Sequence, residues 1–353
     1  MTGELESLRK EIEDIDSKIV ELMVNRNDAA ERVGELKKEL NIPLRNKDVE
    51  KAVTERYRRA AEGTSLSADT AEAVCRLLIS SSVELQSLTV RKQFGKKVTI
   101  IGGEGKMGRW IVGYFKSLGS AVNVIDVSAG SKDYLRDSDV VVISVPISSV
   151  CSVLKDADRI CRKDALIFDI SSIKSPFSSQ LRKMAERRKV CSVHPMFGPS
   201  VVSVADRNIM ICDCGCEAAV SEAEEIFSNG GPNITVTTVE RHDELMAYVL
   251  GFAHASNITF FTALRRSGIP FRELEGASSV TFERTLKASV PVSEENAKLY
   301  HDIQRLNIST EEMWDVYEKA VKDVKEASLS DSSDRFAELM HSGRRYLMRK
   351  DHL

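Results

Sequence analysis

Apolar side chains near the start of the chain recur at alternating intervals of three and four residues. The positions are Leu5, Leu8, Ile12, Ile15, Ile19 and Leu22, and the pattern continues through Val33, Leu36 and Leu40. This spacing predicts one amphipathic helix from about Gly3 to Leu40. At 1.5 Å per residue the helix would be roughly 57 Å long, too long for a compact helical unit of one chain to cover. The pattern therefore predicts a partner chain.

Two shorter helices are predicted after the long one. Residues 48–61 repeat the amphipathic pattern, and Gly63 ends this second helix. Ser67 is a typical N-terminal cap, and a third helix is predicted to run from it to about Val90. The first part of the chain is therefore expected to be an all-α domain of three helices, residues 1–92.

Polar side chains fall on particular faces of these helices. Arg26 and Lys37 are eleven residues apart, almost three full turns, so both point to one face. Arg9 precedes Arg26 by seventeen residues and points to another side, so both could bind one anion only if Arg9 came from a second chain. Ser82 and Gln86 lie one turn apart on the third helix. A single charge of this kind is typical of a solvated helix face, but the combination needs another explanation.

A different pattern begins at Lys97. Short apolar runs typical of strands, VTIIG, AVNVID, DVVVISVP and ALIFDIS, alternate with helical stretches. This alternation predicts a doubly wound parallel sheet, in an α/β domain of Rossmann type over residues 96–240. Residues 241–353 are predicted to be helical, and their apolar run VLGFAHASNITFFTAL is typical of a buried interface helix. We expect them to form an all-α domain, and the family resemblance given below implies that it is the substrate and dimerisation domain.

Composition narrows the class of protein. The 353 residues carry 50 basic and 53 acidic side chains, a formal net charge of -3, which provides no electrostatic footprint for nucleic acid. The chain shows no signal peptide and no apolar run near the roughly 18 residues of a membrane helix, so we expect a cytoplasmic protein without membrane or nucleic-acid partners. We interpret the stretch CDCGC at 212–216 as a strand end and turn with reduced thiols rather than as a metal site.

A glycine-rich turn follows the first predicted strand. Gly103, Gly105 and Gly108 form a GxGxxG pattern, with Lys106 and Met107 between the last two glycines. The first glycine permits the tight turn, the second lets a pyrophosphate approach the backbone, and the third allows close packing of helix and strand. The helix N-terminus would face the anion. Because this pattern alone is weakly specific, a purely structural turn remains an alternative.

The end of the next strand supports a dinucleotide. Asp126 closes the run AVNVID about 20 residues after the glycines, where an acidic side chain binds the ribose hydroxyls of NAD. No arginine follows closely, so the sequence favours NAD over NADP as the cofactor.

Two later strands are followed by polar groups. The run ALIFDISSIK ends with Ser171, Ser172 and Lys174, and VCSVHPMFGP places His194 at another strand end. In an open α/β sheet the carboxyl ends of the strands face the ligand crevice. An imidazole held there by a serine could take a proton from a substrate hydroxyl near neutral pH. A satisfied structural histidine is the alternative.

The first 90 residues resemble the all-helical chorismate mutase family. The resemblance rests on LRKEIEDIDSKIVELMVNR, VGELKK, IPLRNKDVEKAV and SSVELQ. It implies that Arg9 and Arg26 bind carboxylates, with Arg9 reaching across a dimer. It further implies that Lys37 and Gln86 donate to the ether oxygen, while Glu50 contacts the hydroxyl and Ser82 contacts the substrate.

Two positions depart from the mutase pattern. Asn46 stands where the family usually has an aspartate, and Val49 stands where it usually has an arginine. The implied reaction, chorismate to prephenate, requires positioning and electrostatic stabilisation rather than proton transfer. Arg26, Lys37 and Arg9 would remain as cations.

The remainder of the chain resembles prephenate dehydrogenase, on the motifs GGEGKMG, SVP, DISSIK and HPMFGP. By this resemblance His194 takes the proton of the ring hydroxyl as hydride leaves the same carbon for NAD. Loss of carbon dioxide then gives 4-hydroxyphenylpyruvate. Ser172 would orient His194 and the hydroxyl, and His254 would lie near the substrate in the helical domain. A helix-packing role is the alternative for His254.

One departure concerns substrate binding. The family usually carries an arginine that binds the prephenate side-chain carboxylate, and Pro291 occupies that place. Lys287 lies one helical turn earlier and Arg284 two turns earlier, so either could approach the same crevice if the helix continues to Pro291. We expect one of this pair to bind the carboxylate.

Taken together, the resemblances place the chain with the fused chorismate mutase/prephenate dehydrogenases of tyrosine biosynthesis. They imply a homodimer with one shared two-fold axis, and tyrosine feedback, if present, built into the dehydrogenase site and its interface. Two alternatives remain open. The helical part could be only a dimerisation or regulatory module of a dehydrogenase, or the chain could be a different dinucleotide enzyme, such as a hydroxyacid oxidoreductase.

Overall fold

The computed structural model describes residues 2–40, 42, 46–89, 93–126 and 131–348 of the chain. Contacts divide the chain into two compact units, one of which contains the N-terminal helices and the sheet. The other contains residues from Val239 onward, together with Pro146–Ser148 and Ser172–Ser178. Each unit is described by itself.

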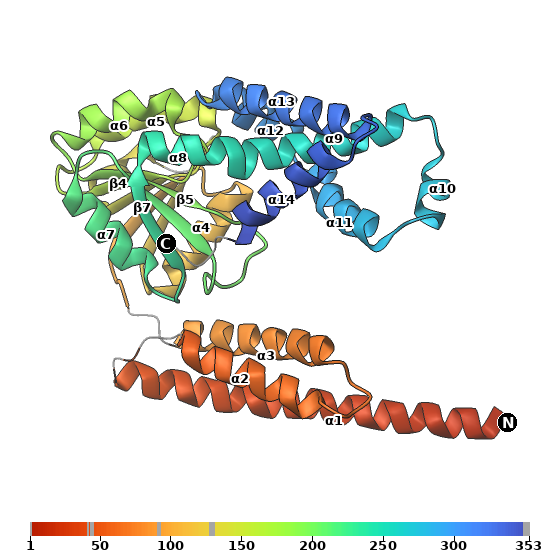
Figure 1. The fold of residues 1–353 in the computed structure, drawn as a ribbon. Coiled ribbons are helices and arrows are strands. Elements are labelled where there is room, and N and C mark those ends of the chain that lie inside the picture. Colours follow the sequence, from red (N-terminus) through yellow and green to blue (C-terminus); the bar gives the residue numbers. More distant parts are fainter. Residues whose placement is uncertain (1, 41, 43–45, 90–92, 127–130, 349–353) are drawn as a thin grey trace. The chain divides into compact units, whose positions relative to one another are not determined.

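The three N-terminal helices form as predicted. They are α1 (Thr2–Glu39), α2 (Lys47–Ala61) and α3 (Ala68–Thr89), with α3 packed against both others. Ser67 caps α3 by accepting the N–H of Thr70 at 3.0 Å. The N-terminal part of α1 extends past α2 and α3 (Figure 1). Its apolar stripe is exposed in this chain: the exposed fraction is 53% at Leu8 and 67% at Leu22.

A seven-stranded sheet follows. The strands are β1 (Lys97–Ile101), β2 (Ala121–Ile125), β3 (Val140–Ile143), β4 (Leu166–Asp169), β5 (Val190–Pro195), β6 (Asn208–Asp213) and β7 (Asn233–Thr238). Their order is β2-β1-β3-β4-β5-β6-β7. The first five strands are parallel, as predicted, whereas β6 runs antiparallel to β5 and β7 is parallel to β6. The alternation of strands and helices gave no sign of this mixed edge.

Both faces of the sheet are buried. Val140 and Val142 of β3 pack in one apolar cluster with residues of α4 (Lys106–Ser117) and α7 (Glu217–Phe227). Val141 and Ile143 alternate with them and are also fully buried, so they face the other side. The further helical segments are η1 (Lys132–Arg136), α5 (Ile147–Ile160), η2 (Ser175–Phe177) and α6 (Ser178–Ala185).

The cysteine stretch has the predicted form. Cys212 lies in β6, and the following turn is held by Asp213, whose Oδ1 accepts the N–H of Gly215 at 2.7 Å and of Cys216 at 3.1 Å. No group of histidine, cysteine or carboxylate side chains that could hold a metal ion occurs in the described part of the chain.

The second unit is helical. Its elements are α8 (Val239–Met246), the π-helical segment η3 (Ala247–Phe252), α9 (Ala253–Arg266), α10 (Phe271–Gly276), α11 (Val280–Glu294), α12 (Ala297–Leu306), α13 (Thr310–Ser328) and α14 (Asp334–Met348). Among the described residues, no helix is both long and apolar enough to cross a membrane. The fold is therefore a helical N-terminal domain, an α/β domain of Rossmann type and a helical C-terminal domain.

Candidate active sites

A cavity of about 390 Å³ opens among the three N-terminal helices. Its lining contains five polar residues predicted from the sequence and the two departures from the family pattern: Arg26, Lys37, Glu50, Ser82, Gln86, Asn46 and Val49. Apolar side chains such as Val33, Val53 and Val83 complete the wall. The structure thus brings together side chains from all three helices. Sequence spacing alone could show only which side chains of one helix share a face.

Hydrogen bonds fix the polar side of this cavity. Arg26 Nη1 donates to Ser82 Oγ, and at 2.7 Å to the carbonyl oxygen of Leu78. Lys37 Nζ donates to Gln86 Oε1 at 3.3 Å. Ser82 and Gln86 are each only 7% exposed. Two cations are therefore held on one wall, where they can meet a dianionic ligand.

The ammonium of Lys37 is electrostatically unusual. Burial lowers the pKa of Lys37 below the usual lysine value, and the nearby Glu50 carboxylate opposes that shift. Burial also strengthens the interaction of the ammonium with any charge that develops on a ligand, because the local dielectric is low.

The two departures have different structural outcomes. Asn46 is the N-cap of α2, and its Oδ1 accepts the N–H of Asp48 at 3.0 Å and of Val49 at 3.1 Å. Asparagine and aspartate are equally good caps, so this position keeps its role in starting the helix. Val49 lines the cavity with an exposed apolar side chain and supplies no charge.

Arg9 is separated from this cavity within one chain. It is an exposed residue of α1, near the end that extends past α2 and α3 (Figure 1). The cavity lining formed by a single chain includes Arg26 and Lys37 but not Arg9. Seventeen residues of α1 separate Arg9 from Arg26, about 25 Å along the helix axis, so the contribution of Arg9 from a second chain stays a prediction.

The glycine loop leaves no room for a side chain at three of its glycines, Gly102, Gly103 and Gly108. A Cβ at Gly108 would lie 2.0 Å from the carbonyl oxygen of Gly102, and a Cβ at Gly103 would lie 2.6 Å from Val124 Cγ1. Gly102, which the sequence motif did not include, has φ +83 and would place a Cβ 2.2 Å from the carbonyl oxygen of Ser144. The doubled glycine directly after the strand was the available signal for this position.

The start of α4 and the end of β2 fit a dinucleotide. Gly105 is the N-cap of α4, and within the described residues no side chain caps it, while Lys106 and Met107 begin the helix. Asp126 directly follows β2, and its Oδ2 accepts the N–H of Glu104 at 3.1 Å. The N-terminal N–H groups of a helix bind phosphate, and a carboxylate after the second strand binds ribose hydroxyls. These residues therefore fit a dinucleotide cofactor.

Polar residues follow two adjacent parallel strands, β4 and β5. Asp169 is the last residue of β4 and is fully buried. Its carboxylate accepts hydrogen bonds from the N–H of Ser171 at 2.9 Å and from Ser192 Oγ at 2.5 Å. Ser172 follows and is half-buried. His194 lies near the end of β5 and is 4% exposed. Sequence reasoning missed Asp169, although a carboxylate at the end of an apolar strand was visible.

His254 begins α9 in the helical unit. Its ring stacks on Tyr300 of α12, with the ring centroids 3.9 Å apart and the planes 7° from parallel. Burial lowers the pKa of His254 and so favours the neutral imidazole. Its Nδ1 is buried and has no hydrogen-bond partner among the residues that the structure describes.

A π-helical segment sets the direction of His254. His242 and His254 are twelve residues apart, which in a regular α-helix places them about a third of a turn from each other. The segment 247–252 adds one residue to a turn, so the two histidines come within about 20° of one face. Gln304 Nε2 donates to the carbonyl oxygen of Gly251 at 2.7 Å and stabilises this turn.

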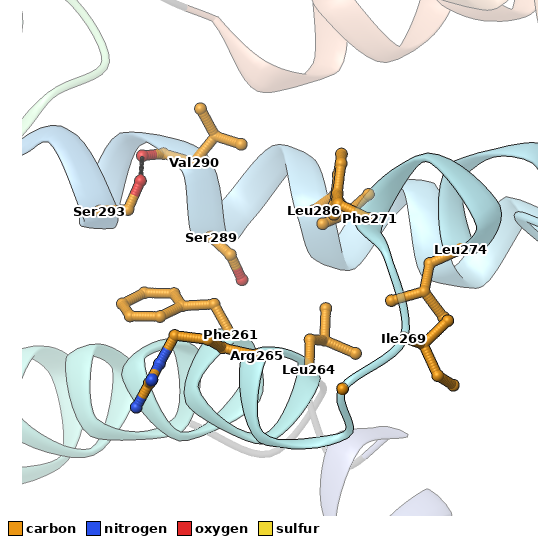
Figure 2. A pocket seen from close by; sticks show the side chains of 11 residues that line it. Phe261, Leu264, Arg265, Ile269, Phe271, Leu274, Leu286, Ser289, Val290 and Ser293 are labelled. Atoms are coloured by element: carbon orange, nitrogen blue, oxygen red, sulfur yellow. Dashed lines mark hydrogen bonds between the residues drawn. The ribbon is translucent and has the colours of Figure 1, made fainter.

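Helix α11 continues through Pro291, which was the condition for Arg284 or Lys287 to approach the same crevice. Arg284 and Lys287 are both exposed on this helix. A cavity of about 430 Å³ lies between α9 and α11, and Figure 2 shows Phe261, Leu264 and Leu286 lining it. Its lining includes Arg265, Ser289 and Ser293 but neither Arg284 nor Lys287.

Comparison with known proteins assigns both parts of the chain. Residues 8–87 match the family described as chorismate mutase type II. Residues 91–210 match the nucleotide-binding domain of prephenate dehydrogenase, and residues 238–342 match its dimerization domain. The T-protein of Haemophilus influenzae is 27% identical over 311 residues, which cover 85% of this chain and 80% of the relative. The chain belongs to the family of fused chorismate mutase/prephenate dehydrogenases.

Other similar proteins correspond to only one of the two enzymes in the fused chain. The chorismate mutase of Methanocaldococcus jannaschii is 31% identical over 86 residues, 24% of this chain and 87% of the relative. The crystal structure of prephenate dehydrogenase from A. aeolicus in complex with hydroxyphenyl propionate and NAD+ covers 72% of this chain and 98% of its own, with a TM-score of 0.61 and 16% identity. At this identity the structural likeness shows the fold.

Proposed function

We propose that the helical N-terminal domain converts chorismate to prephenate in the cavity lined by Arg26 and Lys37. The observation that carries this proposal is the gathering of five predicted residues from three helices around that cavity. Arg26 would bind a carboxylate, with Arg9 of a second copy binding the other. Ser82 would hold Arg26 in place, and Glu50 would accept the substrate hydroxyl.

The rearrangement needs no nucleophile and no proton transfer. Lys37 and Gln86 would donate to the ether oxygen as its bond to carbon lengthens, so the stabilisation grows toward the transition state. The helices hold both donors before the substrate arrives, which reduces the entropic cost of reaching the reactive conformer.

We further propose that the remainder of the chain oxidises and decarboxylates prephenate. NAD, when bound, would accept the hydride. His194 would take the proton of the ring hydroxyl, and Ser172 would orient the imidazole and that hydroxyl. His194 lies one residue before the end of β5, and Ser172 follows β4. The carboxyl ends of these strands lie at the edge of the sheet where ligands of open α/β folds bind. His254 would contact the substrate.

The proposed cofactor residues are Gly103, Gly105, Lys106, Met107, Gly108 and Asp126. The clash that a Cβ at Gly108 would cause with the carbonyl oxygen of Gly102 supports the close packing of helix and turn that the third glycine of this motif allows. Asp126 would bind the ribose diol and would repel a 2′-phosphate, so we propose NAD rather than NADP.

For the prephenate side-chain carboxylate we propose Arg284 or Lys287 as the cation, since Pro291 can supply none. Both side chains are exposed on α11 and can reorient when substrate binds. Variants of each residue in the full chain, assayed for the KM of prephenate, would decide between them.

We propose a homodimer with domains at 1–92, 96–240 and 241–353. The exposed apolar stripe of α1 and the match of residues 238–342 to a dimerization domain support this assembly. We also propose a cytoplasmic location, and that tyrosine feedback, if present, acts at the dehydrogenase site and its interface. Sedimentation of the full chain, and dehydrogenase rates with added tyrosine, test these points.

The two activities are tested separately on the full chain. Chorismate without cofactor should be consumed, and prephenate should give NADH faster than NADPH at equal cofactor concentration. Persistent chorismate would make the helical domain a dimerisation or regulatory module. Absence of NADH from prephenate would instead leave a different dinucleotide enzyme.

A further inference from the structure

The helical second unit contains a buried carboxylate that the proposed reaction does not use. Asp243 of α8 is 1% exposed. Its two oxygens accept the N–H of Lys174 at 3.0 and 3.1 Å, and Oδ2 accepts the N–H of Ser175 at 2.6 Å. Ser175 Oγ also donates to Oδ2, and His242 Nδ1 lies 2.7 Å from Oδ1. Both acceptor atoms are therefore shared among several donors.

This carboxylate is ionised and rigidly held. Burial alone would raise the pKa of Asp243, but the hydrogen bonds from His242 and Ser175, the charge of His242 and the N–H of Lys174 together lower it. Hydrogen bonds to an ionised acceptor are roughly twice as strong as neutral ones. Asn307 Nδ2 holds the Asp243 backbone from another side by donating to its carbonyl oxygen at 2.7 Å.

The backbone that Asp243 holds begins two residues after Ser172. Residues Ser172–Ser178 belong to the same compact unit as Asp243, although they lie in the chain between strands of the sheet. The segment begins at Ser172 and reaches η2 at Ser175, so fixing the N–H groups of Lys174 and Ser175 restricts the position of Ser172. Before this segment, the N–H of Ser171 is fixed by Asp169.

We propose that Asp243 is a positioning residue for the dehydrogenase reaction, whose carboxylate fixes the backbone of Lys174 and Ser175 and thereby holds Ser172. The inference rests on the proposed function of Ser172 in orienting His194 and the substrate hydroxyl. A misplacement of about 1 Å in such a group can cost on the order of 10²-fold in rate. The structure assigns this role to a residue that contacts neither the glycine loop nor the sheet strands in any described hydrogen bond.

The test uses the full-length Asp243→Asn variant. The substitution keeps the shape but turns one acceptor into an amide that faces N–H donors. We expect kcat for prephenate oxidation to fall on the order of 10²-fold, with the KM for NAD and the mutase rate unchanged. Hydrogen exchange at the Lys174 and Ser175 amides should become faster. The milder Ser175→Ala variant removes one donor and should lose less activity.

Two controls separate positioning from general support of the fold. Asp302→Asn changes another buried carboxylate of the same unit, which pairs with Lys298 and not with this loop, and it should leave kcat unchanged. In a Ser172→Ala background, adding Asp243→Asn should lower kcat by a further factor of less than about three. Mutations of coupled residues are not additive, and Ser172 is already lost in that background. Equal losses in both backgrounds would show a merely structural role and overturn the inference.

The outcomes also separate this inference from the proposed function. A wild-type chain that oxidises prephenate while Asp243→Asn keeps its kcat and its amide exchange would overturn the inference alone. A wild-type chain that consumes chorismate but never oxidises prephenate would refute the proposed dehydrogenase function, and this inference with it. Loss of kcat with faster exchange, absent from Asp302→Asn, would support both.

Discussion

The mutase cavity and the dehydrogenase residues are built in different ways. Apart from the expected contribution of Arg9, the side chains that line the cavity come from one chain. Most lie on three packed helices, and Ile42 and Asn46 lie in the segment before α2. The residues that we propose for the dehydrogenase reaction are divided between the two compact units: His194 belongs to the unit with the sheet, whereas Ser172 and His254 belong to the helical one.

This difference follows the chemistry of the two proposed reactions. A pericyclic rearrangement needs fixed charges, which rigid helices supply by placing Lys37 and Gln86 one hydrogen bond apart. Oxidation requires a cofactor, a base and a substrate to meet, and open α/β folds bind ligands at the strand ends where other elements can be added. Each half should therefore fail independently when its own residues are changed.

The largest effect is expected from His194→Asn. Loss of the base should lower kcat for prephenate oxidation by about 10²- to 10⁴-fold, while chorismate consumption by the same sample stays unchanged. The same substitution at the exposed His341 is the control and should alter neither rate. A normal kcat in His194→Asn would remove His194 from the mechanism.

Lys37→Gln should have the opposite effect on the two activities. Removal of one transition-state donor should lower the mutase rate by about 10²- to 10³-fold, with NADH formation from prephenate unaffected. Lys38→Gln, at the exposed neighbouring position, serves as the control. If both activities fell together, the two halves would not be independent.

The contribution of Arg9 can be isolated by mixing chains. Arg9→Ala and Lys37→Gln homodimers should each be nearly inactive as mutases. If Arg9 acts across the dimer, each co-refolded heterodimer contains one cavity with both residues intact and one cavity with neither. The heterodimer should then have about half of the mutase activity of the wild-type dimer. No recovery in heterodimers verified by mass would place Arg9 outside the mutase site.

A smaller gain is expected from Val49→Arg. A cation at this position, on the first turns of α2, should strengthen carboxylate binding and lower the KM for chorismate by up to about tenfold, within the range of one charged contact. Val49→Met has similar length without charge and should leave the KM near its original value. An unchanged KM in Val49→Arg would show that this wall does not face the carboxylate.

The smallest effect concerns pH. Because Lys37 must be protonated to donate, and because burial lowers its pKa, mutase activity should fall as pH rises through a value below the usual lysine pKa. Dehydrogenase kcat should not share this alkaline limb. Lys37→Arg should move the limb to higher pH, since arginine stays protonated. A limb that persists unchanged in Lys37→Arg would belong to another group.

Local patterns predicted much of the fold. The three-four periodicity predicted α1 to within one or two residues of Thr2–Glu39, and Ser67 predicted the start of α3. The glycine motif predicted the turn into α4. These elements depend on residues close in the sequence, so the pattern contains the necessary information.

Features set by contacts between distant residues could not be predicted in the same way. The antiparallel direction of β6 depends on how its chain returns to β5, and the π-helical turn before His254 depends on packing against α12 through Gln304. The hydrogen bonds from Lys174 and Ser175 to Asp243 join positions 68 and 69 apart in the chain. The roles of His194 and Ser172 stay predictions until their variants are assayed.

The most direct test supplies chorismate and NAD, with no added prephenate, to the purified full-length chain and follows chorismate and NADH together. We predict that chorismate disappears first and that NADH then appears after a short lag. Chorismate that persists while added prephenate yields NADH would contradict the mutase half. Chorismate loss without any NADH would contradict the dehydrogenase half.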